Sequence, residues 1–316
     1  MISLGELAKK LQGEKSIALF CHIRPDGDSI GSALALKLSL QSLGSKVDVY
    51  CDDTIPLRFS FLNHVDTIFN GELGEYDALC AIDCADISRL GKYAENFAKH
   101  KNTYVIDHHV SNPRYAKINY VFDNASNCEN VYALITQLGV QITSDIANLL
   151  GTGLVTDTGN FRHKNVTPYT FMVASKLLEN GADFNAIVYN NFNKQTKERA
   201  KLFGIVMSKI RYFLDNRFAV ATVFQSDIAL SGATQDQTEG FIDFVMGIDS
   251  VEVGACILEI AKNKFKISFR SKNADVNAVA GTFGGGGHVL ASGCQISGEY
   301  EEVVDKIRFA VSQHLE

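Results

Sequence analysis

The stretch Thr103-Tyr104-Val105-Ile106-Asp107-His108-His109 decides the fold of the first half of the chain. Its first four residues are β-branched or aromatic, which is typical of a strand, and one aspartate and two histidines follow them. Two similar apolar runs are residues 16–21, followed by His22, and residues 78–82, followed by Asp83. In an open sheet of parallel strands, ligands bind at the carboxyl ends of the strands. The repeated pattern therefore predicts one site built on three strand ends.

Helical patterns separate these strands. Residues 29–43 have the apolar spacing of a helix and stop at Gly44, residues 46–50 follow as a strand, and residues 87–100 form a second helical pattern. Strands that alternate with helices predict βαβ units and a mainly parallel sheet flanked by helices. Further helices are expected over residues 128–138, 144–155 and 169–179.

The pattern changes in the second half of the chain. Residues 190–212 are first polar and then periodic, which predicts a connecting helix. Beyond this range we expect strands over 218–224, 252–259 and 265–270, and helices over 238–247 and 301–314. The sequence therefore predicts an α/β fold in three parts, which are an N-terminal domain over 1–189, a helical linker over 190–214 and a smaller α+β domain over 215–316.

The composition restricts the class of protein and its partners. Of the 316 residues, 46% are hydrophobic and 21% are charged, as in ordinary globular proteins. The net charge of −6 argues against binding to long duplex nucleic acid, which requires a basic surface, but it permits a small phosphorylated ligand. The seven cysteines form no CxxC pair, and no apolar run reaches the roughly 18 residues of a membrane span. We therefore expect a cytoplasmic protein with free thiols and no membrane partner.

The loop His22-Ile23-Arg24-Pro25-Asp26-Gly27-Asp28 follows the first predicted strand. Pro25 disfavours helix at the residue before it, and Gly27 permits a tight bend, so the loop can direct His22, Asp26 and Asp28 to one point. The alternative is that Asp28 only caps the next helix. Taken alone, Asp83 could likewise be a solvated turn residue, and Asp157 could be a residue of a helix-terminal turn.

Together, these residues predict a metal site. Carboxylates that are buried side by side resist ionisation, so gathering several of them is unfavourable unless cations lie between them. Mixed imidazole and carboxylate ligands suit Mn²⁺ better than a Mg²⁺ site made only of oxygens. Two such metals would activate a bridging water for attack on a phosphate ester. The candidate residues are His22, Asp26, Asp28, Asp83, Asp107, His108, His109 and Asp157.

A glycine run near the C-terminus predicts a phosphate site. It consists of Gly284, Gly285, Gly286 and Gly287, and His288 follows it. Without side chains, the backbone N–H groups of such a run can approach a phosphate closely, and the guanidinium of Arg270 could add a planar fork of donors. The alternative is a flexible loop.

These motifs, in this order, resemble the DHH/DHHA1 phosphoesterases over nearly the whole chain. The N-terminal half matches through the His22–Asp28 loop, Asp83, the Asp107-His108-His109 motif and Asp157-Thr158-Gly159. The C-terminal part matches through Phe269-Arg270-Ser271, Asp275-Val276-Asn277, Gly284 to His288, and Ala291-Ser292-Gly293. The chain departs from the family pattern at three places. Val110 stands where some relatives carry arginine, Val289 where a polar residue is common, and Asn127-Cys128-Glu129 where many relatives have small hydroxyl residues.

The resemblance implies a role for each candidate. His22, Asp26 and Asp83 would hold one Mn²⁺, while Asp28, Asp83, His108 and Asp157 would hold a second, with Asp83 bridging the two. Mg²⁺ or Co²⁺ are alternative metals. His109 would contact the scissile phosphate, and Asp107 would orient His108 or its surroundings. The distal end of the substrate would be bound by Arg270, Ser271, Gly284, Gly285, Gly286, Gly287 and His288.

In its overall size, the chain resembles the nanoRNases and pAp phosphatases, a subgroup of this family. This implies hydrolysis of short single-stranded RNA, of 3′-phosphoadenosine 5′-phosphate, or of both. A related alternative is hydrolysis of cyclic di-AMP or of linear pApA. An inorganic pyrophosphatase and a non-catalytic nucleotide sensor are alternatives from other classes. The preferred substrate, the polarity of attack on RNA and the oligomeric state, monomer or homodimer, are open.

Overall fold

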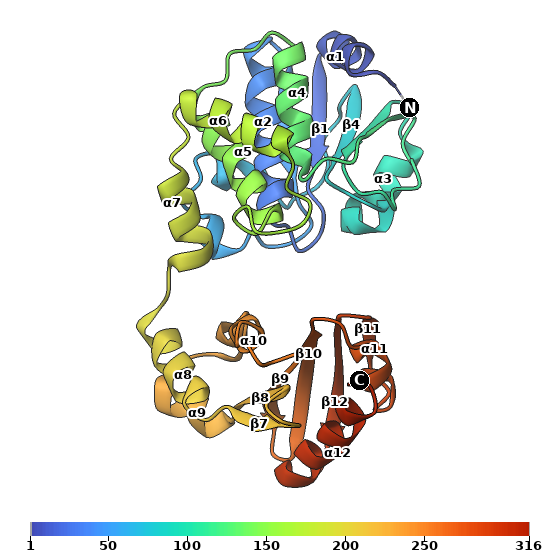
Figure 1. Cartoon of the computed structure of the whole chain (residues 1–316). Helices are drawn as coiled ribbons and strands as arrows, with labels where there is room; N and C mark the ends of the chain where they lie inside the picture. Colours follow the sequence, from blue (N-terminus) through green and yellow to red (C-terminus); the bar gives the residue numbers. More distant parts are fainter. Residues whose placement is uncertain (1, 316) are drawn as a thin grey trace. The chain divides into compact units, whose positions relative to one another are not determined.

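The structure is a computed structural model that describes residues 2–315 (Figure 1). Its contacts divide the chain into two units, Met1–Lys194 and Gln195–Glu316, here called the first unit and the second unit. Each unit contains its own six-stranded sheet. The predicted mixed α/β fold, with a mainly parallel sheet in the N-terminal part, is confirmed.

The sheet of the first unit is entirely parallel and has the strand order β3-β2-β1-β4-β5-β6. The strands are β1 (Ser16–Phe20), β2 (Lys46–Tyr50), β3 (Ile68–Phe69), β4 (Ala78–Ile82), β5 (Thr103–Asp107) and β6 (Ile118–Val121). The chain runs outward from β1 to β3 and then returns to place β4 on the other side of β1. This reversal is a topological switch point, where doubly wound folds bind their ligands. The expected site at the ends of β1, β4 and β5 lies at that point.

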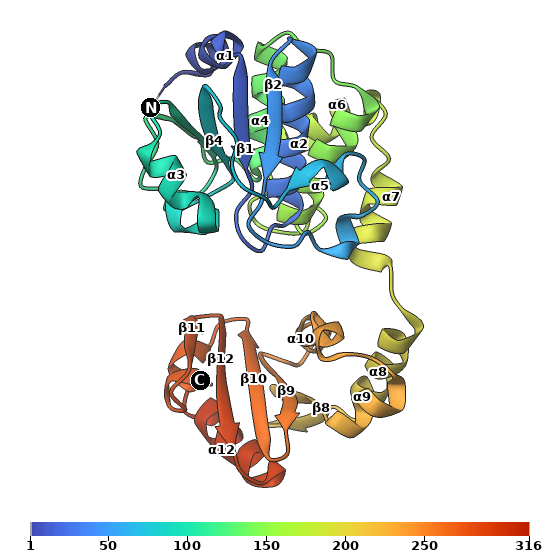
Figure 2. The same cartoon turned by 180° about the vertical axis from the view of Figure 1, so that it is seen from behind.

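Helices cover both faces of this sheet (Figures 1 and 2). The larger layer packs on the main hydrophobic core and contains α1 (Leu4–Gly13), α2 (Gly27–Ser42), α4 (Asn127–Gln137), α5 (Ser144–Asp157), α6 (Pro168–Glu179) and α7 (Phe184–Val188). The opposite face is covered by η3 (Ile87–Tyr93) and α3 (Ala94–Lys99). Short 3₁₀ turns, η1 (Leu57–Phe59) and η2 (Val65–Thr67), lie between β2 and β3.

The helix predicted over residues 87–100 is split at Gly91. This glycine has a φ of 60°, and a Cβ there would lie 2.3 Å from Oδ2 of Asp52. The backbone conformation and the close contact together require glycine at this position. The chain therefore forms a 3₁₀ segment before Gly91 and a short α-helix after it.

The predicted connecting helix over residues 190–212 also consists of two pieces. A π-turn, η4 (Tyr189–Asn193), is followed by Lys194 in an extended conformation. The next helix, α8 (Lys197–Met207), begins at the N-cap Thr196, whose side chain accepts a hydrogen bond from the N–H of Arg199. The boundary between the two units falls in the interruption.

The second unit has a mixed sheet with the order β11-β12-β10-β9-β8-β7, in which only β8 and β9 pair in parallel. The strands are β7 (Arg211–Phe213), β8 (Phe218–Val223), β9 (Val253–Ala261), β10 (Lys264–Ser271), β11 (Gly286–His288) and β12 (Ala291–Ser297). The helices are α9 (Gln225–Ser231), α10 (Phe241–Met246), α11 (Val276–Gly281) and α12 (Tyr300–Ser312), with the 3₁₀ turn η5 (Gln235–Thr238). Gly240, at a φ of 81°, separates η5 from α10, so the helix predicted over 238–247 starts later than expected.

One face of this second sheet is covered and the other is partly open. Phe265, Ile267 and Phe269 of β10 point into a core formed with α11 and α12. The alternate residues Lys266, Ser268 and Arg270 point to the opposite face, because side chains alternate along a strand. Helices α8 and α10 pack on the β8–β9 part of that face.

The seven cysteines are all buried free thiols, as predicted. Between residues 2 and 315, no helix is long and apolar enough to cross a membrane.

Candidate metal centre

The loop after β1 contains three of the predicted ligands. Asp26 is the N-cap of α2, because its Oδ1 accepts hydrogen bonds from the N–H groups of Asp28 (3.1 Å) and Ser29 (3.0 Å). Its Oδ2 lies 3.5 Å from Nε2 of His22, a buried residue. Asp28 lies within the first turn of α2 and is 0% exposed. The cap of this helix is therefore Asp26, and the alternative role of Asp28 as the cap is wrong.

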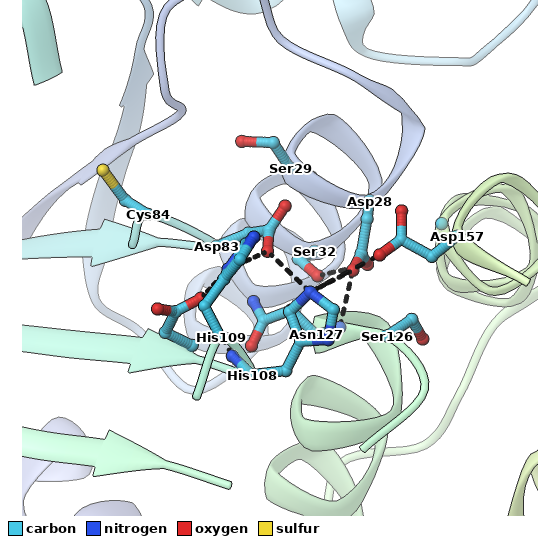
Figure 3. A network of polar contacts seen from close by, with 12 residues as sticks. Asp28, Ser29, Ser32, Asp83, Cys84, His108, His109, Ser126, Asn127 and Asp157 are labelled. Carbon is cyan, nitrogen blue, oxygen red and sulfur yellow. Dashed lines mark hydrogen bonds and ion pairs between the residues drawn. The ribbon is translucent and has the colours of Figure 1, made fainter. Parts of the chain in front are cut away.

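Asp83 contacts two histidines from different segments of the chain, His22 and His108, and Figure 3 shows the second of these contacts. It follows β4 with a φ of 53°, a conformation that aspartate and asparagine adopt more readily than most residues. Its Oδ2 lies 3.7 Å from Nε2 of His22, and its Oδ1 lies 3.4 Å from Nε2 of His108. Within residues 2–315, this Oδ1 is buried and has no hydrogen-bond partner. Asp83 is thus a buried carboxylate and not a solvated turn residue.

His108 belongs to the second group of ligands. Its Nε2 lies 3.4 Å from Oδ2 of Asp157 and 3.9 Å from Oδ2 of Asp28. Its Nδ1 lies 3.0 Å from the carbonyl oxygen of Asn124. Because a carbonyl oxygen only accepts hydrogen bonds, Nδ1 is the protonated nitrogen and donates to it. The lone pair of Nε2 is then available for a metal, the arrangement usual for metal-binding histidines.

Asp157 reaches Asp28 because α5 packs closely against α2. At Gly31, a Cβ would lie 2.2 Å from the carbonyl oxygen of Leu149, and at Gly153 a Cβ would lie 2.6 Å from Oδ1 of Asp28. A side chain at either glycine would push the two helices apart, since packed interiors leave no free volume. The two glycines therefore set the separation of the two carboxylates.

The electrostatics of the centre favour added cations. Burial and the charge of Asp83 raise the pKa of Asp28 to about 7, and burial and the charge of Asp28 raise the pKa of Asp157 to about 11. Although burial opposes its charged form, contacts with Asp26 and Asp83 raise the pKa of His22 to about 10. Acids that resist ionisation lack sufficient positive charge nearby, and a divalent cation would supply it.

The ligand atoms form two separate groups that could each hold a metal ion. They are His22, Asp26 and Asp83, and Asp28, His108 and Asp157, and within each group the atoms lie within 4.8 Å of one another. The unpaired Oδ1 of Asp83 and the mixed imidazole and carboxylate donors fit divalent cations. These six residues are called the ligand cluster below.

Asp107 and His109 lie beside the ligand cluster. Oδ1 of Asp107 accepts hydrogen bonds from Nδ1 of His109 (2.8 Å) and from the N–H of His108 (2.9 Å), while its Oδ2 accepts from Nδ2 of Asn112 (2.6 Å). The Asp107 side chain is fully buried, whereas the His109 side chain is 35% exposed. A third group of potential metal ligands joins His109 to Asp83 and His108, but its Nδ1 is the atom that already contacts Asp107. Asp107 therefore orients the ring of His109 and only the backbone of His108.

Three neighbours of the centre were not singled out as functional candidates from the sequence. Nη2 of Arg89 lies 2.7 Å from Nδ1 of His22, Asn112 contacts Asp107, and the N–H of Asn127 donates to Oδ2 of Asp28 (2.6 Å). Arg89 lies in η3, Asn112 in the loop after β5, and Asn127 at the start of α4, so no periodic pattern marks them. Of the three, only Asn127 could have been noticed in the sequence, because it stands in a segment that departs from the family pattern.

In the second unit, the strand register places Arg270 and His288 on one face. Arg270 pairs with Ala291 of β12, and Ala291 pairs with His288 of β11. Residues directly opposite in antiparallel strands project to the same side, so the small residue Ala291 lies between the two candidate side chains. Figure 2 shows β11, β12 and β10 side by side. The side of the sheet that carries Arg270 and His288 is here called the open sheet face. Lys266, Ser268 and Arg270 line a pocket of about 510 Å³ on it.

Ser271 does not lie on the open sheet face. As the residue after Arg270, it points to the other side of the strand. Its Oγ accepts hydrogen bonds from the N–H groups of Asn273 (3.1 Å) and Ala274 (2.7 Å). These contacts close the turn after β10.

The sequence predicted bare N–H donors along the glycine run, but three of its four N–H groups already have partners within the protein. The N–H of Gly284 donates to Gly281, that of Gly285 to Ala280, and that of Gly287 to Oδ1 of Asn277. Gly286 and Gly287 belong to the edge strand β11 and not to a loop. The physical reason for glycine is close approach, since a Cβ at Gly285 would lie 2.2 Å from the carbonyl oxygen of Gly293.

Comparisons with known proteins cover both units. Residues 16–154 match the DHH family, N-terminal domain, and residues 215–316 match the DHHA1 domain. The bifunctional oligoribonuclease and PAP phosphatase NrnA of Thermus thermophilus is 32% identical over 96% of this chain and 92% of its own. The probable bifunctional oligoribonuclease and PAP phosphatase NrnA of Streptococcus mutans is 27% identical over 93% of both chains. The crystal structure of an exopolyphosphatase-related protein from Bacteroides fragilis superposes with a TM-score of 0.85 at 26% identity, covering 98% of this chain and 95% of the other.

Proposed function

The chain belongs to the DHH family of phosphoesterases, and from this premise we propose that it hydrolyses short oligoribonucleotides and 3′-phosphoadenosine 5′-phosphate with two manganese ions. The observation that carries the proposal is the position of Asp83, a buried carboxylate between two groups of metal ligands at the switch point of the sheet. The names of the two relatives support this choice of substrates.

In this proposal, each group of the ligand cluster would hold one metal ion. His22, Asp26 and Asp83 would hold one ion, while Asp28, His108 and Asp157 would hold the other together with Asp83. When bound, two divalent ions supply activation of a water molecule and neutralise charge on the phosphoryl group. Mg²⁺ and Co²⁺ are the alternatives to Mn²⁺, and the imidazole ligands favour Mn²⁺ over Mg²⁺.

His109 would contact the scissile phosphate. Its Nδ1 donates to Asp107, so its orientation is held, and its Nε2 remains for a phosphoryl oxygen. Asp107 in turn is held by Nδ2 of Asn112. A donor that is positioned before the reaction stabilises developing charge without reorganisation.

The open sheet face would bind the distal end of the substrate. Arg270 offers a planar fork of donors to a phosphate, and His288 lies on the same face, with Ala291 between them. In this proposal Gly284, Gly285, Gly286 and Gly287 shape the edge of the face, and Ser271 supports Arg270 through the turn that it closes. Small nucleotides suit the net charge of −6, which does not favour binding along a long strand of nucleic acid.

A comparison of substrates tests the proposal. We expect measurable kcat/KM with Mn²⁺ for RNA of two to five nucleotides and for 3′-phosphoadenosine 5′-phosphate, and loss of both activities on chelation. Linear pApA and cyclic di-AMP test the related alternative, and pyrophosphate tests the pyrophosphatase alternative. Turnover of pyrophosphate alone, or of no substrate with any of the three metals, would contradict the proposed function.

A further inference from the structure

The carboxamide of Asn127 is a buried polar group without a partner. The residue is 0% exposed, and neither its Nδ2 nor its Oδ1 makes a hydrogen bond. Across the described part of the chain, no other side chain has two buried polar atoms in this state. Native proteins pair nearly all such atoms, because an unpaired one retains the cost of losing its water. A partner for this amide is therefore expected among the molecules that enter the protein.

The position of Asn127 identifies where that partner binds. Asn127 is the first residue of α4, and its N–H donates to Oδ2 of Asp28 (2.6 Å), while the N–H of Cys128 donates to Oδ1 (2.8 Å). Figure 3 shows Asn127 in the same network of contacts as Asp28 and His108. The residue thus lies against the second group of the ligand cluster, and it is as closed to bulk solvent as Asp28 itself. A group that enters the cluster is therefore the candidate partner of this amide.

The chemistry of an amide selects the kind of partner. The carboxylates of Asp28, Asp83 and Asp157 attract cations and repel a phosphate, whereas the NH₂ of an amide is an uncharged donor that binds an anionic oxygen. In a site without bulk water, such a donor stabilises a phosphoryl oxygen more strongly than it would in solution. We propose that Nδ2 of Asn127 donates to a non-bridging oxygen of the phosphoryl group bound at the ligand cluster. The inference rests on the proposed function and adds a catalytic residue to it.

Binding of inorganic phosphate to the manganese-loaded protein tests this role without turnover. In isothermal titration calorimetry, Asn127→Ala should weaken phosphate binding by about tenfold or more, as expected for loss of a hydrogen bond to a charged group. Asn127→Asp should weaken it further, because a carboxylate repels the anion. The affinity for Mn²⁺, measured separately on metal-free protein, should be unchanged in Asn127→Ala, and kcat should fall together with phosphate affinity.

A matched control is Asn191→Ala. The Oδ1 of Asn191 is also buried without a partner, but its Nδ2 already donates to the carbonyl oxygen of Ile187 (2.9 Å), outside the ligand cluster. This variant should retain wild-type phosphate affinity. If Asn127→Ala fails to fold, as judged by circular dichroism, Asn127→Ser provides a shorter donor of smaller size and should show intermediate phosphate affinity.

Two results would overturn the inference. If Asn127→Ala weakens Mn²⁺ binding and Asn127→Asp restores it, Oδ1 is a metal ligand and Nδ2 has no donor role. If both phosphate affinity and kcat of Asn127→Ala equal those of the wild type, the amide is structural. Failure of the proposed function is distinguishable, because the wild type itself would then neither hydrolyse nucleotides nor bind phosphate with Mn²⁺.

Discussion

The two units hold their functional candidates in opposite environments. In the first unit, Asp28 and Asp83 are buried among other acids, and burial and the charge of Asp83 raise the pKa of Asp28. In the second unit, Arg270 and His288 lie on the open sheet face, where Arg270 lines a pocket of about 510 Å³. In the proposed function, the buried acids would hold cations for the reaction, while the accessible donors would recognise the substrate. Variants in the two units should therefore change different kinetic constants.

The largest effect should come from Asp83→Asn. Asparagine tolerates the positive φ at this position and preserves the shape of the side chain, but it removes the charge between the two groups of ligands. We expect kcat to fall by about 10³-fold or more, since charge stabilisation at the reacting group is lost. Steady-state kinetics with saturating Mn²⁺ measure this effect, and circular dichroism confirms the fold. Wild-type turnover in this variant would remove Asp83 from the metal centre.

A change on the open sheet face should affect binding instead. Arg270→Ala should raise KM for nucleotide substrates by about tenfold, because a charged hydrogen bond to phosphate is lost, while kcat stays near the wild-type value. Lys266→Ala, two residues away on the same face and lining the same pocket, is the matched control and should have the smaller effect. A pure loss of kcat in Arg270→Ala would contradict the division between the two units.

His288→Ala should have a smaller and more selective effect. We expect kcat/KM to fall by roughly threefold to tenfold for short RNA, as for a single hydrogen bond, and to stay constant for a small chromogenic phosphodiester. The small substrate reaches the ligand cluster but has no distal end to bind. Equal losses on the two substrates would argue against a role for His288 in recognition.

The pH dependence of stability should separate the metal-free from the metal-loaded protein. The pKa of Asp28 is raised to about 7 and that of Asp157 to about 11, from ordinary values near 4. At a pH between the ordinary and the raised value of each group, the folded state therefore binds more protons than the unfolded state. The raised pKa of His22, about 10, acts in the same direction above its usual value of 6.5. Stability of the metal-free protein should therefore fall as the pH rises from 5 to 8.

Thermal unfolding checks this expectation. The Tm of chelator-treated protein should be lower at pH 8 than at pH 5 by roughly 5 °C, and Mn²⁺ should restore more of it at pH 8. Asp28→Asn combined with Asp157→Asn should flatten the dependence. A metal-free Tm that rises from pH 5 to pH 8 would mean that the carboxylates are already balanced by charges within the protein.

Much of the first unit could be predicted because its signals are local. Apolar runs that end in His22, Asp83 and Asp107 mark strands and their carboxyl ends, and parallel strands bring these ends to one edge of the sheet. The cap of α2 was harder to predict, because Asp26 and Asp28 are both suitable cap residues. Only the fold shows that Asp26 accepts the hydrogen bonds. The free thiols followed from the spacing of the cysteines.

The second unit was less predictable at its glycine run. A row of glycines is compatible with a phosphate-binding loop, a flexible loop or a closely packed strand, because all three need the absence of a side chain. Contacts with Ala280, Gly281 and Asn277, together with the approach to Gly293, select the packed edge strand. None of these partners is evident from the run itself.

By itself, the amino-acid sequence determined which chemical groups stand at the strand ends, because strand and helix periodicity depend on neighbouring residues. Only the tertiary structure decided how far apart those groups lie. Asp28 and Asp157 are 129 positions apart, and they meet because Gly31 and Gly153 let two helices approach closely. Likewise, only the tertiary structure shows that the amide of Asn127 is buried without a partner and that this residue contacts Asp28 of the ligand cluster. Such distances depend on packing between segments remote in sequence, which no local pattern encodes.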